Sequence, residues 1–172
     1  MNTFPTLYTP RLILRKIDAA DIPALLKYAN NKKISDYVLN IPHPYQEPDA
    51  VFRISYVWQG FKQQNRFVFA IILKDNEELI GEVGLHLDNN KQVAQLAYWV
   101  GEPFWGKGMA TEAVKAVLRF GFQQLNLQQI FADCKQENTA SVKVLTNNGM
   151  INDSMTGSIL QYYLTQEAYK SL

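Results

Sequence analysis

One stretch of the chain joins a strand-like pattern to a helix-like pattern through a short loop with two glycines. The stretch runs from Trp99 to Ala113, and the loop is Trp105-Gly106-Lys107-Gly108. Such a loop directs several backbone N–H groups toward one point, at the positive end of the following helix dipole. Because Gly106 and Gly108 have no Cβ, an anion can approach the backbone closely. The stretch therefore predicts an anion site suited to a pyrophosphate.

Two side chains that can exchange protons share one face of a predicted strand over residues 79–87. Odd positions of this strand are mostly apolar, whereas its even positions include Glu82 and His86. At roughly 3.3 Å per residue these two lie about 13–14 Å apart, so they are alternatives rather than a pair. Either can act as a general base if its pKa lies near neutrality, and we prefer Glu82. The simpler interpretation is a solvated strand face.

Hydrophobic periodicity predicts the elements that must position these residues. Helices are expected over about 19–31, 48–64, 109–124 and 138–148. The last of these is capped by Asn138 and ended by Gly149. Strands are expected over 11–17, 67–73, 79–87, 93–100, 130–134 and 159–165. Residues 151–158 are interpreted as a connector, and those after 165 as a polar tail.

This order of elements, β-α-α-β-β-β-α-β-α-β, indicates an α+β fold with a mixed, mostly antiparallel sheet flanked by helices. The strands between 67 and 100 form an antiparallel meander. Neither an internal repeat nor a linker-like change of composition is visible, so residues 1–172 are expected to form a single domain.

Composition narrows the function classes. A formal net charge of +1 gives no electrostatic reason to expect nucleic-acid or membrane-surface binding. A single cysteine, Cys134, excludes an intrachain disulfide and a zinc site built from several cysteines. We expect no signal peptide and no membrane span, because the first residues lack a basic region followed by an apolar run and no apolar stretch approaches 18 residues. The expected location is the cytoplasm.

Four segments, in this order of elements, resemble the GNAT superfamily of acetyl-CoA-dependent N-acetyltransferases. The superfamily loop has the form Gln/Arg-x-x-Gly-x-Gly/Ala, and Gly108-Met109-Ala110 matches its end. Trp105 stands where Gln or Arg is usual, which is similar to the RimJ/RimL-type branch that acetylates N-terminal amines of ribosomal proteins and other amines. Three further segments resemble the same branch: Thr9–Arg15, the Asn-x-x-Ser helix Asn138–Leu145 and Gly149-Met150.

The resemblance implies acetyl-CoA as cosubstrate and no metal. It places the acetyl carbonyl against backbone N–H near Val100, where the superfamily separates two strands, and the pyrophosphate on the N–H groups of Trp105–Ala110. Lys107 adds positive charge there, and Asn138 hydrogen-bonds the pantetheine amides. The expected cofactor-binding residues are Val100, Trp105, Gly106, Lys107, Gly108, Met109, Ala110, Thr111, Asn138 and Ser141.

The acid that protonates the departing thiolate is less conventional. Many members place a tyrosine where this chain has Leu145, so Ser141 becomes the candidate acid, as proposed for the Rim-type branch. The expected catalytic residues are thus Glu82, Ser141 and His86. Plainer roles are a helix cap for Asn138, a buried anchor for Trp105 and a solvated loop position for Lys107. A neighbouring acidic residue, Glu112, is expected to serve the helix N-terminus through its dipole.

The function predicted from these residues is direct acetyl transfer from acetyl-CoA to a primary amine. The acceptor is a protein N-terminus or, alternatively, a small molecule such as a polyamine, an amino sugar or an antibiotic. The loop Ile41–Tyr45 either lines the acceptor site or is a bare connector. A non-catalytic acyl-CoA sensor is an alternative of another class, and a nucleotide-binding domain is disfavoured because a full phosphate-loop pattern is lacking. The resemblance also allows a homodimer.

Overall fold

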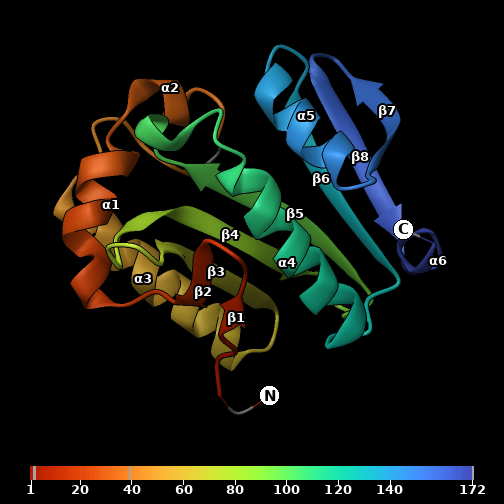
Figure 1. Cartoon of the computed structure of the whole chain (residues 1–172), viewed down its shortest axis with the longest axis horizontal. Helices are drawn as coiled ribbons and strands as arrows, with labels where there is room; N and C mark the ends of the chain where they lie inside the picture. The colour runs from red at the N-terminus through yellow and green to blue at the C-terminus, as the bar shows by residue number, and fades with distance from the viewer. Residues whose placement is uncertain (2, 39, 172) are drawn as a thin grey trace.

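The computed structural model describes residues 1, 3–38 and 40–171. Its centre is an open 8-stranded sheet in the order β1-β2-β3-β4-β5-β6-β8-β7, shown in Figure 1. Every neighbouring pair is antiparallel except β5 and β6. The strands are β1 (Leu7–Tyr8), β2 (Leu12–Lys16), β3 (Arg66–Leu73), β4 (Leu79–Leu87), β5 (Val93–Val100), β6 (Gln129–Lys135), β7 (Ile151–Thr156) and β8 (Ile159–Thr165). The predicted α+β class and the antiparallel meander are confirmed.

Helices cover both faces of the sheet (Figure 1). They are α1 (Ile22–Ala29), α2 (Lys32–Ser35), α3 (Glu47–Lys62), α4 (Met109–Gln123), α5 (Thr139–Asn147) and α6 (Gln166–Lys170). In the described part of the chain, none of them is both long and apolar enough to cross a membrane.

Two hydrophobic cores follow from this covering. Helix α4 buries one apolar face, including Val114 and Phe120, against Phe69 and Leu85 of the sheet. On the opposite face, α1 and α3 pack against Val68 and other sheet residues. Strand β3 is therefore covered on both sides, which explains its nearly continuous apolar sequence.

Several short elements differ from the sequence predictions. The predicted helix over 19–31 is a 3-10 turn followed by α1, and α2 begins separately with Asn31 as its cap. The predicted connector over 151–158 contains strand β7, whose residues are all exposed and which pairs with β8. The predicted polar tail contains α6. Strand β7 and helix α6 contain no buried residue, so they leave little periodicity in the sequence.

The one parallel pairing in the sheet is short. Strand β6 pairs with β5 only from Val93↔Gln129 to Gln95↔Phe131, and then continues alongside β8. On its other side, β5 pairs with β4 in the register Gly81↔Val100. The N–H of Gly101 donates to the carbonyl oxygen of Ile80, so every second residue counted back from Gly101 bonds to β4. Because backbone groups alternate in direction along a strand, Tyr98 and Val100 direct theirs away from β4. They therefore face the slot where β5 and β6 diverge.

Candidate active site

The glycine loop has the geometry of an anion site. Gly106 and Gly108 have φ values of 71° and 75°, in the left-handed region that favours glycine. Gly108 is the N-cap of α4 and no side chain caps this helix. No N–H group from Gly106 to Thr111 forms a well-aligned hydrogen bond to another residue that the structure describes. The loop thus presents free donors at the start of a helix dipole.

The N–H of Trp105 is the exception among the predicted loop donors. It bonds to the carbonyl oxygen of Glu102 at 3.1 Å, so it is already occupied. The indole of Trp105 is 45% exposed and its Nε1 donates to the carbonyl oxygen of Val100 at 2.6 Å. The alternative of a buried anchor is therefore wrong about the burial of Trp105. Trp105 instead fixes the loop to the end of β5, at the edge of the slot.

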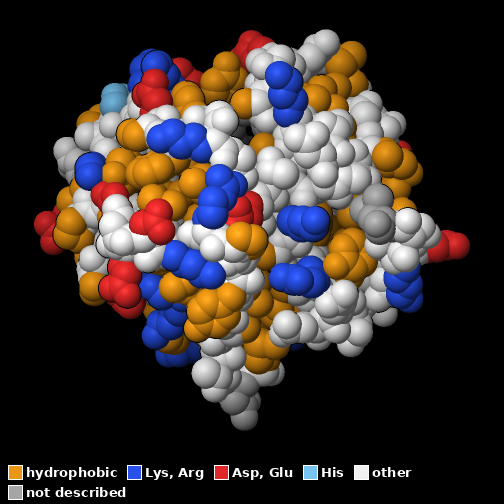
Figure 2. Space-filling model, in the orientation of Figure 1, with side chains coloured by type: hydrophobic (Ala, Val, Ile, Leu, Met, Phe, Trp, Pro, Cys, Tyr) orange, Lys and Arg blue, Asp and Glu red, His pale blue; other side chains and the backbone are white. Residues whose placement is uncertain are grey.

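Positive charge surrounds this loop. Figure 2 shows Lys and Arg side chains distributed over the face that carries α4. Exposed cationic residues on and near the loop, α4 and α5 are Arg11, Lys107, Lys115, Arg119 and Lys143. A potential of this sign favours an anionic ligand over the face where the free N–H groups lie.

Glu112 connects the loop to the start of the sheet. Its carboxylate accepts hydrogen bonds from Thr9 Oγ1 at 2.6 Å, Arg11 N at 2.8 Å and Arg11 Nε at 2.7 Å. Arg11 Nη1 also donates to the carbonyl oxygen of Lys107 at 2.8 Å. Burial raises the pKa of Glu112, but the bonds from Thr9 and Arg11 outweigh it and lower the pKa. Glu112 therefore does more than interact with the helix dipole, because it also joins α4 to residues Thr9 and Arg11.

Ser141 lies on the same face, in the first turn of α5. The predicted cap is confirmed, because Asn138 Oδ1 accepts from Ser141 N at 3.1 Å. Ser141 Oγ lies 2.7 Å from the hydroxyl of Tyr98, which is not among the site residues predicted from the sequence. Burial raises the pKa of Tyr98, so its hydroxyl stays protonated at neutral pH. Cys134 is buried beside this pair, and burial raises its pKa as well.

The opposite face of the sheet carries a small hollow of about 80 Å³. It lies between β3, β4, β5, α3 and the loop before α3. Its lining residues are Val38, Asn40, Ile41, Arg53, Tyr56, Val68, Glu82, Gly84, His86, Ala97, Tyr98 and Trp99. The two alternative bases thus line one hollow, and Ile41 brings the predicted loop to it.

Glu82 is buried in this hollow, with only 2% of its surface exposed. Its Oε2 accepts from Arg53 Nε at 2.9 Å and from Arg53 Nη2 at 2.7 Å. Its Oε1 forms no hydrogen bond within the described part of the chain. The solvated-face interpretation is therefore wrong for Glu82. Arg53 was not identified from the sequence, because no local pattern pairs a helix residue with a strand residue 29 positions away.

His86 has a different environment from Glu82. Its Nδ1 accepts a hydrogen bond from Arg66 Nε at 3.1 Å. Burial, together with the charges of Arg66 and Arg53, lowers the pKa of His86 to about 4. The imidazole is therefore neutral at pH 7, with its proton on Nε2. Across the register from Glu82, the buried Nε1 of Trp99 has no partner among the described residues.

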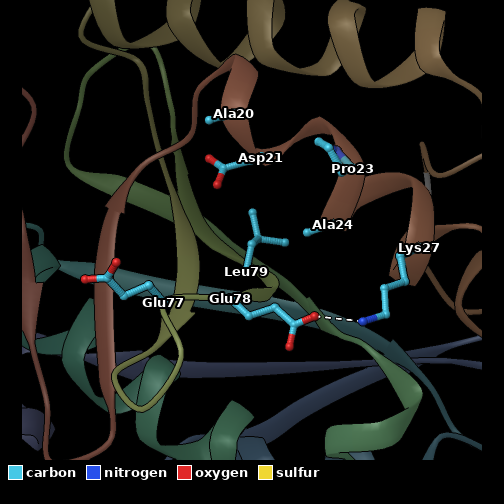
Figure 3. A pocket seen from close by; sticks show the side chains of 8 residues that line it. All are labelled: Ala20, Asp21, Pro23, Ala24, Lys27, Glu77, Glu78 and Leu79. Carbon is cyan, nitrogen blue, oxygen red and sulfur yellow. Dashed lines mark hydrogen bonds and ion pairs between the residues drawn. The ribbon is translucent and has the colours of Figure 1, made fainter.

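A second hollow, of about 300 Å³, lies between the start of α1 and the β3–β4 turn (Figure 3). In this hollow Glu78 pairs with Lys27 at 2.8 Å and accepts from the Tyr28 hydroxyl at 2.6 Å. None of the predicted site residues lines it. The residues predicted from the sequence lie instead around the slot and on the two surfaces beside it.

A profile of the acetyltransferase (GNAT) domain matches residues 11–151. This chain belongs to the GNAT acetyltransferase family. It is 34% identical over 170 residues to an uncharacterized N-acetyltransferase, p20 of Bacillus licheniformis, covering 92% of this chain and 93% of p20. The protein is accordingly an N-acetyltransferase.

Solved structures of this GNAT fold include two of the RimJ/RimL type. Mycobacterium smegmatis RimJ in complex with CoA-disulfide superposes with a TM-score of 0.84 at 20% identity, covering 95% of this chain and 88% of RimJ. RimL, a ribosomal L7/L12 alpha-N-protein acetyltransferase in complex with coenzyme A, has a TM-score of 0.84 at 16% identity, covering 95% of this chain and 99% of RimL. The resemblance stated from the sequence is confirmed.

Proposed function

We propose that this N-acetyltransferase transfers the acetyl group of acetyl-CoA directly to a primary amine, and that the acceptor is the N-terminal amine of a peptide or protein. Acetyl-CoA lies on the face of α4 and α5, and the acceptor enters the hollow on the face of α1 and α3. The two meet at the slot between β5 and β6.

The cofactor half of the proposal rests on the free donors of the loop. The pyrophosphate accepts from the N–H groups of Gly106–Thr111, which other described residues leave unused. The pantetheine arm then lies along the slot, beside the backbone groups of Tyr98 and Val100. Asn138 uses Oδ1 for its cap and keeps its amide NH₂ for that arm. The CoA bound in the RimJ and RimL structures supports this cosubstrate.

Oxyanion stabilisation follows from the same slot. When an amine attacks the thioester carbon, negative charge develops on the carbonyl oxygen. The N–H of Val100 is a fixed dipole that faces the slot and can donate to this oxygen. Positioning both reactants there supplies much of the remaining acceleration.

The amine half rests on a single observation, the unbonded Oε1 of buried Glu82. Arg53 holds the other oxygen, so the orientation of the carboxylate is fixed. Oε1 is then available to bind the substrate ammonium and to take its proton, directly or through a water molecule. His86 is neutral and its Nδ1 accepts from Arg66, so we assign the base to Glu82.

A peptide acceptor is favoured by the surface beside the hollow. Phe52 and Tyr56 of α3 are stacked with ring centroids 6.0 Å apart, and they are 71% and 37% exposed. They offer an apolar surface for residues beyond the reacting amine. The ribosomal-protein substrate named for RimL agrees with a peptide N-terminus. Small amines are the competing acceptors.

A thiol-release assay with acetyl-CoA tests the proposal against peptides with free N-termini, polyamines, amino acids and aminoglycosides. We expect release with peptides, and Glu82→Gln to lower kcat/KM about 10²-fold with an unchanged Kd for CoA. Asp153→Asn, an exposed change on β7, is the matched control and should keep full activity. If no acceptor gives thiol release although CoA binds, the result would favour a non-catalytic sensor. If CoA does not bind, the assignment of the glycine loop as the pyrophosphate site would be overturned.

A further inference from the structure

We propose that Tyr98 and Ser141 form a two-hydroxyl proton relay that protonates the departing thiolate of coenzyme A, with Tyr98 as the proton source behind Ser141. The proposal rests on the proposed acetyl transfer. It also accounts for Leu145, which occupies the helix position where a tyrosine is common in the family. In this chain the phenol reaches the site from the strand instead of the helix.

The geometry brings the two hydroxyls together from different elements. Tyr98 belongs to β5 in the section beyond its pairing with β6, and Ser141 lies in the first turn of α5. Their oxygens are 2.7 Å apart, the usual separation for an O–H···O hydrogen bond. Asn138 Oδ1 accepts from the backbone N–H of Ser141, which fixes the first turn of α5, and the Oγ lies against the phenol. The relay is therefore in place before any ligand binds.

Ser141 is a weak acid when it acts alone. A serine hydroxyl that gives up its proton becomes an alkoxide, which is far more basic than a thiolate. A phenol has an ordinary pKa of about 10. Burial raises the pKa of Tyr98 above this value, but a phenol remains a stronger acid than a serine hydroxyl in the same surroundings. A proton that passes from Tyr98 to Ser141 as Ser141 gives its own to sulfur avoids the alkoxide. Tyr98 is buried and protonated at neutral pH, so it holds a proton ready to give.

The tetrahedral intermediate collapses, its C–S bond breaks, and sulfur leaves with the electron pair. Sulfur takes the proton from Ser141 Oγ, and Oγ takes the proton from the Tyr98 hydroxyl. The substrate nitrogen gives up two protons in all, one from the ammonium before attack and one as the amide forms. One of them returns through water to the phenolate of Tyr98, and the other stays in solution. The products are the acetylated amine, free CoA thiol and one proton in solution.

Tyr98 acts through Ser141 and is thus a positioning residue in the relay. The competing account is that its hydroxyl only fastens α5 to β5. A fastening role predicts a loss of stability and of CoA affinity, whereas a relay predicts a loss of kcat and a changed pH profile. These readouts separate the two accounts.

The test compares Tyr98→Phe, Ser141→Ala and the double variant in the full chain. We expect each single change to lower kcat by 10- to 100-fold, with KM for acetyl-CoA within threefold of wild type. The double variant should lose no more than the worse single variant, since residues that act as a unit are not additive. Tyr162→Phe, which alters another buried phenol in the same core, should keep full activity.

A fluorotyrosine at position 98 keeps the hydroxyl but acidifies it, and serves where Tyr98→Phe fails to fold. It should shift the alkaline limb of the kcat profile to lower pH. Any of three results would overturn the relay. These are an alkaline limb that does not shift, a kcat loss in the double variant equal to the product of the two single losses, and wild-type kcat in Tyr98→Phe. If wild type itself releases no thiol with any amine, the proposed function fails first, and this outcome is distinct from a failure of the relay in an active enzyme.

Discussion

Two residues that line the hollow beside α3, Glu82 and His86, owe their chemistry to the arginines beside them. Arg53 ion-pairs with Glu82 and Arg66 donates to His86, and both arginines are remote in sequence from their partners. The sequence pattern correctly placed Glu82 and His86 on one strand face, but it contained no sign of either partner. For this reason the surroundings of the two side chains could not be inferred from residue type. The structure shows that Glu82 is paired with an arginine and that the imidazole of His86 is neutral.

His86 should make the stability of the protein depend on pH. Its pKa of about 4 lies below the ordinary value of about 6.5. Between these values the unfolded chain binds more protons, so stability is full above the unfolded pKa and falls as pH decreases toward 4. From pH 7 to pH 5 the contribution of His86 amounts to about 2 kcal/mol.

Urea unfolding of wild type and His86→Gln at both pH values measures this effect. The free energy of unfolding of wild type should decrease more than that of the variant, because only wild type has the imidazole to protonate. Equal decreases would contradict the burial of a neutral His86.

At the scale of elements, the clearest dependence is that of the glycine loop on the start of the sheet. Glu112 of α4 holds Thr9 and Arg11, and Arg11 holds the carbonyl oxygen of Lys107. Removing the carboxylate leaves these donors without their acceptor and frees the loop to move.

We therefore expect Glu112→Ala to lower the free energy of unfolding by about 1–3 kcal/mol and to weaken CoA binding. Glu167→Ala, an exposed change in the first turn of α6, is the control and should alter neither property. Denaturant unfolding and calorimetric CoA titration measure the two effects. If Glu112→Ala has wild-type values in both experiments, the hydrogen bonds of Glu112 contribute neither to stability nor to CoA binding.

The sequence predicted those elements that bury an apolar face. The start of α4 at Met109, the cap at Asn138 and the bounds of β4, β5 and β8 were all predicted correctly. Strand β7 was missed because its side chains are all exposed. With neither face in the core, its sequence does not alternate between apolar and polar residues. The contact of Tyr98 with Ser141 was missed for another reason, since it depends on how far β5 and β6 diverge.

For the molecule as a whole, the sheet separates two groups of candidate site residues. The loop and Ser141 lie on one face, Glu82 and His86 line the other, and the slot beyond Gln95↔Phe131 connects them. This arrangement makes a prediction for backbone amides. Those of Ala97 and Trp99 bond to β4, whereas those of Tyr98 and Val100 face the slot.

Hydrogen exchange can follow these amides residue by residue. In the free protein, Tyr98 and Val100 should exchange faster than Ala97 and Trp99, which serve as internal controls. Adding CoA should slow exchange at Tyr98 and Val100 by at least about tenfold while the controls stay slow. Equal protection of all four amides in the free protein would mean that the slot is closed.

Trp105 is held on the glycine loop by its bond to Val100 and is partly exposed, which has a practical consequence for spectroscopy. The chain has three tryptophans, and Trp99 is buried while Trp105 is 45% exposed at the loop. Trp58 is partly covered, with Lys16 Nζ lying 3.3 Å from its ring centroid. A polar quencher in solution therefore reaches the Trp105 indole most readily. Its fluorescence is a native optical reporter of the loop, and ligand titrations can be followed by light without attaching a dye.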